Sequence, residues 1–367
     1  MYYHEVCGCK LSALGFGMMR LPLRADGTID EPLVAQMVRL AIEGGVNYFD
    51  TAYPYHQGES ERVTGRVLRA YPRESFHLAS KFPGHMPEGA RGPAAIFEEQ
   101  LEKCGVDYFD FYLLHNVSER SMAFYTDPAV GCLDYFLEQK RLGRIRHLGF
   151  SCHAKPEGLE QFLDYADGRL EFCQIQLNYL DWTLQDAKRK CDILAAHNMP
   201  VWVMEPVRGG RLAVLPGTLG DGLLAAQPDK SIPSWAFRWL QGLDNLGMIL
   251  SGMSTSEQVA DNLHTFAAPS PLTEAENAQL MDIAERLKGA VPCTGCRYCC
   301  DGCPAGLDIP ALLRAENDLR FGGSPDLTAL PSDRRADACL GCGQCASVCP
   351  QKIDVPAELR KLAARGN

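Results

Sequence analysis

The chain has 367 residues, which is more than one average domain needs and fits a large domain with an appendage. Its composition, with 46% hydrophobic and 22% charged residues, is typical of a globular protein, and no run approaches the roughly 18 apolar residues of a membrane span. A net charge of −10 argues against nucleic acid, because phosphate binding requires a basic surface. We therefore expect neither a membrane nor a nucleic acid as a partner.

The first residues, MYYHEVCGCK, lack the basic and apolar segments of a signal peptide, so we expect a cytoplasmic protein. In that compartment the 16 cysteines are expected to be thiols or metal ligands rather than disulfides. Nine of the 16 fall between residues 293 and 349, which indicates a domain boundary near residue 288. We expect a first domain over residues 1–287 and a second over 288–367.

In the first domain, short runs rich in β-forming residues alternate with amphipathic helical stretches. Eight strands are predicted, at ALGFGM, VNYFDTA, FHLASKF, YFDFYLLH, IRHLGFS, FCQIQLNY, PVWVMEP and LGMILSG. The alternation predicts an α/β fold with a parallel sheet, and eight units within about 250 residues fit a closed (β/α)8 barrel, the TIM barrel. No G-x-G-x-x-G opens a helix after the first strand, which counts against a Rossmann domain.

Side chains that could handle a proton follow three neighbouring strands. The second strand ends in FDTAYPYHQGESE, the third reaches Lys81, and the fourth ends at His115. Because the carboxyl ends of barrel strands share one mouth, we expect these side chains to lie together. An ammonium stabilises a phenolate and so lowers a phenol pKa from about 10, a carboxylate could fix the ammonium, and a histidine could orient a carbonyl. The set predicts a general acid for carbonyl reduction.

The second domain contains two copies of one unit, related by an offset of 46 residues, each reading C-x2-C-x2-C-x3-C-P. In bacterial ferredoxins three cysteines of such a run hold one [4Fe–4S] cluster and the fourth ligates the other cluster. We predict two [4Fe–4S] clusters in a small, mostly helical ferredoxin-like domain. Zinc, the competing metal, uses two separated C-x2-C pairs and fits less well. The predicted ligands are Cys293, Cys296, Cys299 and Cys349 for one cluster, and Cys339, Cys342, Cys345 and Cys303 for the other.

The segments LGFGMMRLP, FDTAYPY, ASKF, YLLH, GRIRHLGFS and QIQLNY, in this order, resemble the aldo-keto reductase family across the barrel. With CTGCRYCCDGCP and GCGQCASVCP, the chain resembles the subgroup of bacterial and archaeal members that carry a C-terminal ferredoxin-like domain. The resemblance implies Tyr55 as proton donor, Lys81 as its pKa partner, Asp50 as the third member of the set and His115 as the carbonyl-orienting group. The family spacing from aspartate to tyrosine excludes Tyr53.

The resemblance also implies a nicotinamide cofactor, NAD(H) or NADP(H). Ser151 and Gln174 stand where the family holds the carboxamide, and Cys152 replaces an asparagine beside that serine. Met204 stands where an aromatic ring normally stacks on the nicotinamide, and Glu205 replaces the following serine.

The far end of the cofactor matches the family less closely. Backbone groups near Arg208 and Gly209 could cradle a pyrophosphate. Alignment back from Asn262, taken as a cofactor-binding position, places Gly252 and Gln258 where the family has basic side chains for the 2′-phosphate of NADPH.

Hydride transfer moves two electrons together, whereas an iron–sulfur cluster passes one at a time. Our leading hypothesis is an oxidoreductase that reduces a carbonyl or oxidises an alcohol with a nicotinamide, while its clusters exchange electrons with a ferredoxin or another electron-transfer protein. A second hypothesis places a flavin in the barrel, because a flavin can divide a hydride into single electrons. A third is a non-catalytic electron-transfer or assembly module, against which the complete set of proton-handling residues argues.

Overall fold

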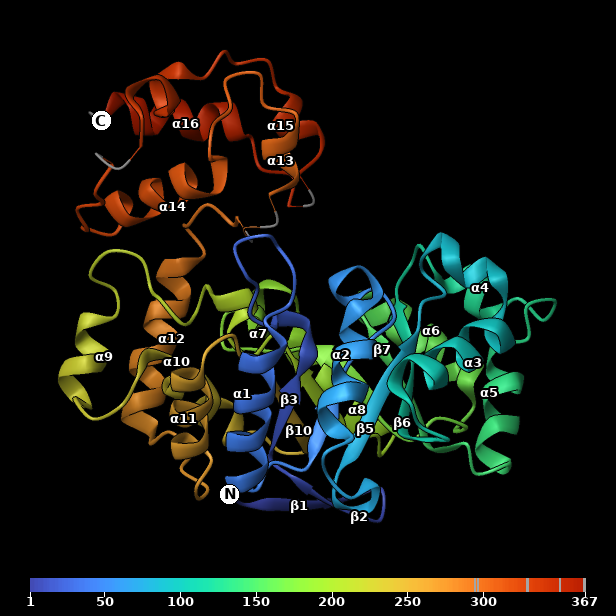
Figure 1. Cartoon of the computed structure of the whole chain (residues 1–367). Coiled ribbons are helices and arrows are strands. Elements are labelled where there is room, and N and C mark those ends of the chain that lie inside the picture. The colour runs from blue at the N-terminus through green and yellow to red at the C-terminus, as the bar shows by residue number, and fades with distance from the viewer. Residues whose placement is uncertain (294, 296, 328–329, 350, 366–367) are drawn as a thin grey trace. The chain divides into compact units, whose positions relative to one another are not determined.

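The computed structural model describes residues 1–293, 295, 297–327, 330–349 and 351–365 (Figure 1). Contacts divide the chain into two compact units, Met1–Pro206 with Phe237–Leu272, and Val207–Ala236 with Thr273–Asn367. The second unit thus takes in residues that precede the predicted boundary between 287 and 288, which stays a prediction.

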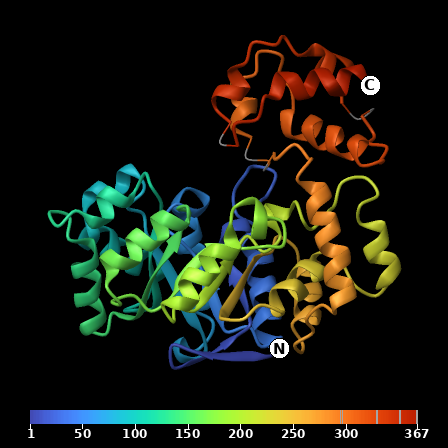
Figure 2. The ribbon, with the colours of Figure 1, turned by 180° about the vertical axis from the view of Figure 1, so that it is seen from behind.

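The first unit is a closed barrel of eight parallel strands, which confirms the predicted fold (Figures 1 and 2). Every strand pairs in parallel with its two neighbours, in the order β10-β3-β4-β5-β6-β7-β8-β9. The strands coincide with the eight predicted runs, because β-branched and aromatic residues pack on both faces of a parallel sheet. Their bounds are β3 (Leu14–Gly17), β4 (Tyr48–Asp50), β5 (His77–Phe82), β6 (Phe109–Val117), β7 (Ile145–Cys152), β8 (Cys173–Gln176), β9 (Val201–Met204) and β10 (Leu246–Gly252).

A hairpin that the sequence analysis did not predict precedes the barrel. Strands β1 (Tyr3–Val6) and β2 (Cys9–Ser12) pair antiparallel through the turn residues Cys7 and Gly8, whose φ angles are 52° and 71°. Val6, Cys7 and Cys9 pack against a buried cluster that includes Phe111 and Trp202 of the barrel strands. The hairpin therefore covers the amino-terminal end of the barrel, opposite the end where the predicted catalytic residues lie.

Helices connect the strands of the first unit. Helix α1 shows how the sequence sets their ends: the Asp30 carboxylate accepts a hydrogen bond from the Leu33 amide at 3.4 Å, and Pro32 stands in the first turn. The bounds are α1 (Glu31–Glu43), α2 (Glu59–Leu68), α3 (Pro93–Cys104), α4 (Met122–Thr126), α5 (Cys132–Arg141), α6 (Pro156–Ala166), α7 (Asp181–Leu184), α8 (Ala187–Ala196) and α11 (Ser256–Thr265), with the short 3-10 turns η1 (Met18–Arg20), η2 (Tyr55–Gly58), η3 (Arg73–Ser75) and η4 (Pro87–Arg91).

The second unit is helical in its described residues, and the sequence repeat returns as a structural repeat. Helix α15 (Gln344–Ser347) begins 46 residues after α13 (Tyr298–Asp301). Helix α16 (Val355–Ala364) begins at the same offset after α14 (Ile309–Arg320). Asp308 and Asp354 cap the two longer helices by accepting hydrogen bonds from the backbone amides of Ala311 and Ala357. The helices α14 and α16 lie side by side over a core of buried leucines (Figures 1 and 2).

Residues 207–236 join this unit through hydrogen bonds to the tail. The amide of Gly217 donates to Asp318 Oδ1 at 3.2 Å, and the Arg211 guanidinium donates to the Val291 carbonyl at 3.2 Å. The unit also contains η5 (Arg208–Gly210), α9 (Asp221–Ala226), α12 (Glu274–Leu287), η6 (Ser332–Arg334) and η7 (Ala336–Ala338), while α10 (Ile232–Gln241) spans both units. In the described part of the chain, no helix has the length and apolar character needed to cross a membrane.

Candidate active site

An ion pair is buried at the carboxyl mouth of the barrel. Asp50 is the last residue of β4, and Lys81 lies near the end of the neighbouring strand β5. The Lys81 ammonium donates to Asp50 Oδ1 at 2.5 Å and to the carbonyl of Thr51 at 2.8 Å. The interaction with the carboxylate raises the Lys81 pKa, although burial alone would lower it. Lys81 is therefore a fixed cation whose charge is balanced by Asp50.

Tyr55 lies in the loop after β4, where η2 begins. Its hydroxyl oxygen accepts a hydrogen bond from Lys81 at 3.4 Å, and the ammonium lies 4.9 Å from the centre of its ring. The sequence predicts that this ammonium lowers the Tyr55 pKa. Burial has the larger effect and the net pKa is raised, although Lys81 does act in the predicted direction. The phenol is consequently protonated at neutral pH.

His115 stands near the end of β6, with its ring centre 6.0 Å from that of Tyr55 and the two rings almost perpendicular, at 81°. Burial, together with the Lys81 charge, lowers the His115 pKa well below its ordinary value. The imidazole is therefore neutral at neutral pH. A second histidine, His85 in the loop after β5, lies with its ring centre 4.8 Å from that of His115. His85 is not among the site residues predicted from the sequence, although it follows a strand end as the others do.

Tyr53 points to a different set of partners. Its hydroxyl donates to the Glu99 carboxylate at 3.3 Å and accepts from Arg91 at 3.2 Å, and the Lys103 ammonium lies 3.9 Å from its ring centre. Tyr53 is thus bound to charged side chains that belong to η4 and α3, whereas Tyr55 contacts Lys81.

A buried polar network lies behind Lys81, and the sequence analysis did not identify it. Glu61 of α2 is fully buried and accepts hydrogen bonds from the Ser80 hydroxyl at 2.6 Å and from the Gln100 amide at 2.5 Å. The same amide donates to the Lys81 carbonyl at 3.0 Å. These contacts hold the backbone of β5 at the point where Lys81 reaches the mouth.

The two residues predicted to hold a carboxamide lie together. Ser151 of β7 and Gln174 of β8 are direct partners in the parallel pairing, and both are buried. The Ser151 hydroxyl accepts a hydrogen bond from the backbone amide of Asn116 at 2.7 Å. Burial raises the pKa of Asp50 overall. The Lys81 charge and a hydrogen bond from the Gln174 side chain act in the opposite direction, so Gln174 lies close to the ion pair. Met204 ends β9, two strands away from Ser151.

The remaining predicted cofactor residues have other local surroundings. Asn262 on α11 is buried and donates from Nδ2 to the Ser251 hydroxyl at 3.0 Å, which ties the helix to β10. Arg208 and Gly209 belong to η5 in the second compact unit, with φ angles of 49° and 64°. Their roles in cofactor binding stay predictions.

One set of predicted cluster ligands surrounds a single pocket of the second unit. The four cysteines that the repeat assigns to the second cluster all line it, among them the ligand that crosses over from the first copy: Cys303, Cys339, Cys342 and Cys345. Four thiols around one pocket are the donor set that a [4Fe–4S] cluster requires. In the described residues, no three His, Cys, Asp or Glu side chains are placed to bind a single metal ion.

The other predicted ligand set is described in part. Cys293, Cys299 and Cys349 pack against the buried core of the tail, while Cys296 lies outside the described residues. The amide of Gly295 donates to Cys293 Sγ at 3.4 Å, an interaction of the kind that tunes cluster potentials.

Comparison with known proteins identifies the families that the two parts of the chain match. Residues 13–215 match the aldo/keto reductase family, and residues 292–353 match the 4Fe-4S dicluster domain. The NADH-specific methylglyoxal reductase of Escherichia coli is 24% identical over 309 residues, which cover 72% of this chain and 91% of that protein.

Solved structures share the barrel. An aldo-keto reductase from Bacillus halodurans, in its holo form, superposes with a TM-score of 0.63 at 25% identity, over 77% of this chain and 96% of that chain. An aldo-keto reductase from Klebsiella pneumoniae in complex with NADPH shows the same fold, with a TM-score of 0.61 at 20% identity over 78% of this chain and 94% of that chain. The protein therefore belongs to the aldo/keto reductase family, is an oxidoreductase, and carries a 4Fe-4S dicluster domain in its C-terminal part.

Proposed function

We propose that the barrel reduces a small carbonyl compound, or oxidises the corresponding alcohol, with NAD(H) or NADP(H), through Asp50, Tyr55, Lys81 and His115. The observation that carries this proposal is the position of the Lys81 ammonium, which contacts Asp50 at 2.5 Å and the Tyr55 hydroxyl at 3.4 Å. A phenol beside a fixed cation can release a proton and leave a stabilised phenolate.

Each side chain has a separate task in this mechanism. The Tyr55 hydroxyl donates its proton to the carbonyl oxygen as negative charge develops there, and Lys81 stabilises the phenolate that remains. Asp50 compensates the Lys81 charge in the resting site, which matters because an unpaired buried cation is costly. The neutral His115 imidazole donates one hydrogen bond to the carbonyl oxygen and so orients it toward Tyr55.

The proposed nicotinamide would supply or accept the hydride. Ser151 and Gln174 are partners in the pairing of β7 with β8, and both side chains are buried. They provide a hydroxyl and an amide beside the ion pair, which suits a carboxamide. The name of the Escherichia coli relative, an NADH-specific methylglyoxal reductase, favours NADH and a small dicarbonyl as the first compounds to test. Arg208, Gly209, Met204 and Asn262 are the further residues that we propose for cofactor binding.

We further propose two [4Fe–4S] clusters with crossed ligands, which exchange single electrons with a ferredoxin or a similar protein. The support is the pocket lined by Cys303 together with Cys339, Cys342 and Cys345, because Cys303 belongs to the other copy of the repeat.

The test of the barrel chemistry compares two tyrosines on one loop. In Tyr55→Phe, methylglyoxal reduction with NADH should fall by about 10²–10⁴, the usual contribution of a general acid, while NADH binding measured by fluorescence titration stays nearly unchanged. Tyr53→Phe is the matched control and should keep its activity, because that hydroxyl is bound by Glu99 and Arg91. Full activity in Tyr55→Phe on a substrate that the wild-type enzyme reduces would overturn the assignment.

A further inference from the structure

The amino-terminal end of the barrel carries a thiol, an imidazole and a carboxylate in one line. Cys9 Sγ of β2 lies 3.4 Å from His147 Nε2, and His147 Nδ1 lies 2.9 Å from Glu171 Oε2. His147 belongs to β7 and Glu171 precedes β8, so three separate segments bring these groups together. A nucleophile within reach of a base that a third group orients is the arrangement used in nucleophilic catalysis.

Glu171 is fixed on its other oxygen. Its Oε1 accepts hydrogen bonds from the Lys140 ammonium at 2.6 Å and from the Leu148 amide at 2.9 Å. Burial raises the Glu171 pKa, but the hydrogen bonds from His147, Lys140 and Leu148 outweigh it and bring the pKa to about 2. The carboxylate is therefore ionised and can accept a hydrogen bond from His147 Nδ1. In the tautomer with the proton on Nδ1, the lone pair of Nε2 faces the Cys9 thiol.

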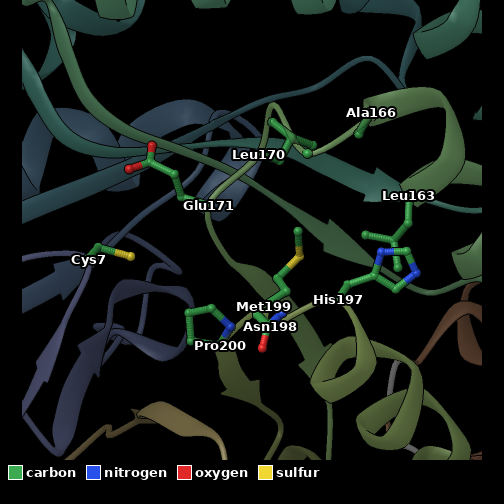
Figure 3. Close-up of a pocket in the computed structure, with 10 residues that line it drawn as sticks. Cys7, Leu163, Ala166, Leu170, Glu171, His197, Asn198, Met199 and Pro200 are labelled. Atoms are coloured by element: carbon green, nitrogen blue, oxygen red, sulfur yellow. The ribbon is translucent and has the colours of Figure 1, made fainter.

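A pocket of about 410 Å³ adjoins this line of side chains. Cys7, Glu171, His197 and Met199 are among its lining residues, and Figure 3 shows the Cys7 sulfur directed toward its interior. Glu171 thus belongs both to the wall of the pocket and to the line of side chains. Cys9 itself is partly exposed, in contrast to the buried thiols Cys104, Cys132, Cys152 and Cys173 of the barrel.

We propose that Cys9 is a nucleophilic thiol that undergoes exchange with small, uncharged disulfides at its partly exposed position beside this pocket, with His147 as general base and Glu171 as a positioning residue. In the reaction the Cys9 S–H bond breaks and its proton moves to His147 Nε2. The sulfur forms an S–S bond with the near sulfur of the disulfide, whose own S–S bond breaks. The leaving thiolate takes the proton from His147, so that one thiol is consumed and another is released.

The charges around Cys9 explain why a base is needed and why the reagent is uncharged. Burial raises the Cys9 pKa, and Asp110, Glu171 and Glu5 raise it further against the opposing effect of Arg146. The resting thiol is therefore protonated, and the nucleophile forms only by proton transfer to His147. The same carboxylates disfavour an anionic disulfide.

The experiment measures thiol modification in the holoenzyme under anaerobic conditions at neutral pH. The probe is 2-hydroxyethyl disulfide, and mixed disulfides are quantified at each cysteine by peptide mass spectrometry over time. Cys191, a partly exposed thiol on α8 whose pKa burial raises to about 12, is the internal reference. Cys9 should react about 100-fold faster than Cys191, as general base catalysis provides. The anionic dithiodiglycolate should react with Cys9 more slowly than the uncharged probe does.

Two variants separate base catalysis from simple exposure. His147→Gln should bring the Cys9 rate down to that of Cys191, whereas His4→Gln should leave it unchanged, because the His4 ring contacts the Leu246 carbonyl instead. If the His147→Gln substitution unfolded the hairpin, other buried thiols would also react faster, and the same measurement would detect this. The ratio of the Cys9 and Cys191 reaction rates in the wild-type protein is a test that needs no variant. A wild-type Cys9 that reacts no faster than Cys191, or a folded His147→Gln that keeps the wild-type rate, would overturn the proposal.

Discussion

The ammonium of Lys81 lies 2.5 Å from Asp50 Oδ1, and the two residues are 0% and 4% exposed. At such burial each charge depends on the other, because desolvation of an isolated ion costs several kcal/mol. Removal of either charge alone should therefore destabilise the mouth, in addition to its effect on the proposed chemistry of Tyr55.

Lys81→Met should destabilise the protein as well as inactivate it. The substitution leaves the Asp50 carboxylate buried without its cation, and breaking such a pair typically costs about 3–5 kcal/mol. Urea denaturation followed by circular dichroism would measure the change in the free energy of unfolding.

The double variant Asp50→Asn, Lys81→Met separates the two effects. It removes both charges, so it should recover part of the lost stability while carbonyl reduction stays abolished. A Lys81→Met protein as stable as the wild type would mean that Asp50 finds another partner or takes up a proton at little cost.

The pH dependence of catalysis follows from the raised pKa of Tyr55, which burial causes and Lys81 only partly offsets. The proton donor stays loaded below its pKa, so the rate of carbonyl reduction should be flat through neutral pH and fall only above about pH 10, the ordinary tyrosine value. Alcohol oxidation needs the phenolate as base, so its rate should rise as the pH approaches the raised pKa of Tyr55. A pH–rate profile at saturating cofactor checks both limbs. A break near neutral pH that disappears in Tyr55→Phe would contradict the account.

Two neighbouring thiols provide the test of the clusters. Cys303→Ser should damage the cluster held by Cys339, Cys342 and Cys345, because Cys303 lines the same pocket although it belongs to the other copy of the repeat. Activity with one-electron donors such as reduced viologen should then be lost, while direct reaction with NADH is spared. Iron and acid-labile sulfide, about eight of each per chain in the wild type, would be measured alongside.

Cys300→Ser is the matched control, since Cys300 has no partner cysteine in the repeat and should leave both clusters and both activities intact. Equal loss of the viologen and NADH reactions in Cys303→Ser, or loss of neither, would count against electron passage through the clusters.

The barrel and the positions of the catalytic candidates could be predicted because each strand is a continuous run of β-forming residues that ends at the site. Asp50 and His115 are recognisable from their places at strand ends, and the dicluster domain from an offset of 46 residues that the helices α14 and α16 repeat. In these cases a local pattern and a geometric rule were sufficient.

Other features depend on contacts between distant segments. The hairpin β1–β2 is short and half polar, and its covering of the barrel end depends on packing against Phe111 and Trp202. The network of Glu61 and Gln100 joins two helices whose polar residues look like ordinary surface positions in the sequence. The direction of the Tyr55 pKa was predicted incorrectly because burial, which sequence spacing does not reveal, outweighs the Lys81 charge.

The central proposal is direct hydride transfer in the barrel with Tyr55 as proton donor, and isotope transfer tests it most directly. The purified holoenzyme would reduce methylglyoxal with NADH that carries deuterium at the transferable position of C4, and the product would be analysed by mass spectrometry and NMR. We expect deuterium on the carbon that was the carbonyl carbon. The rate at which this labelled product forms should fall by about 10²–10⁴ in Tyr55→Phe and be retained in Tyr53→Phe. Product that forms at full rate with solvent hydrogen at that carbon would contradict the account, because the electrons would then have reached the substrate through a flavin or the clusters.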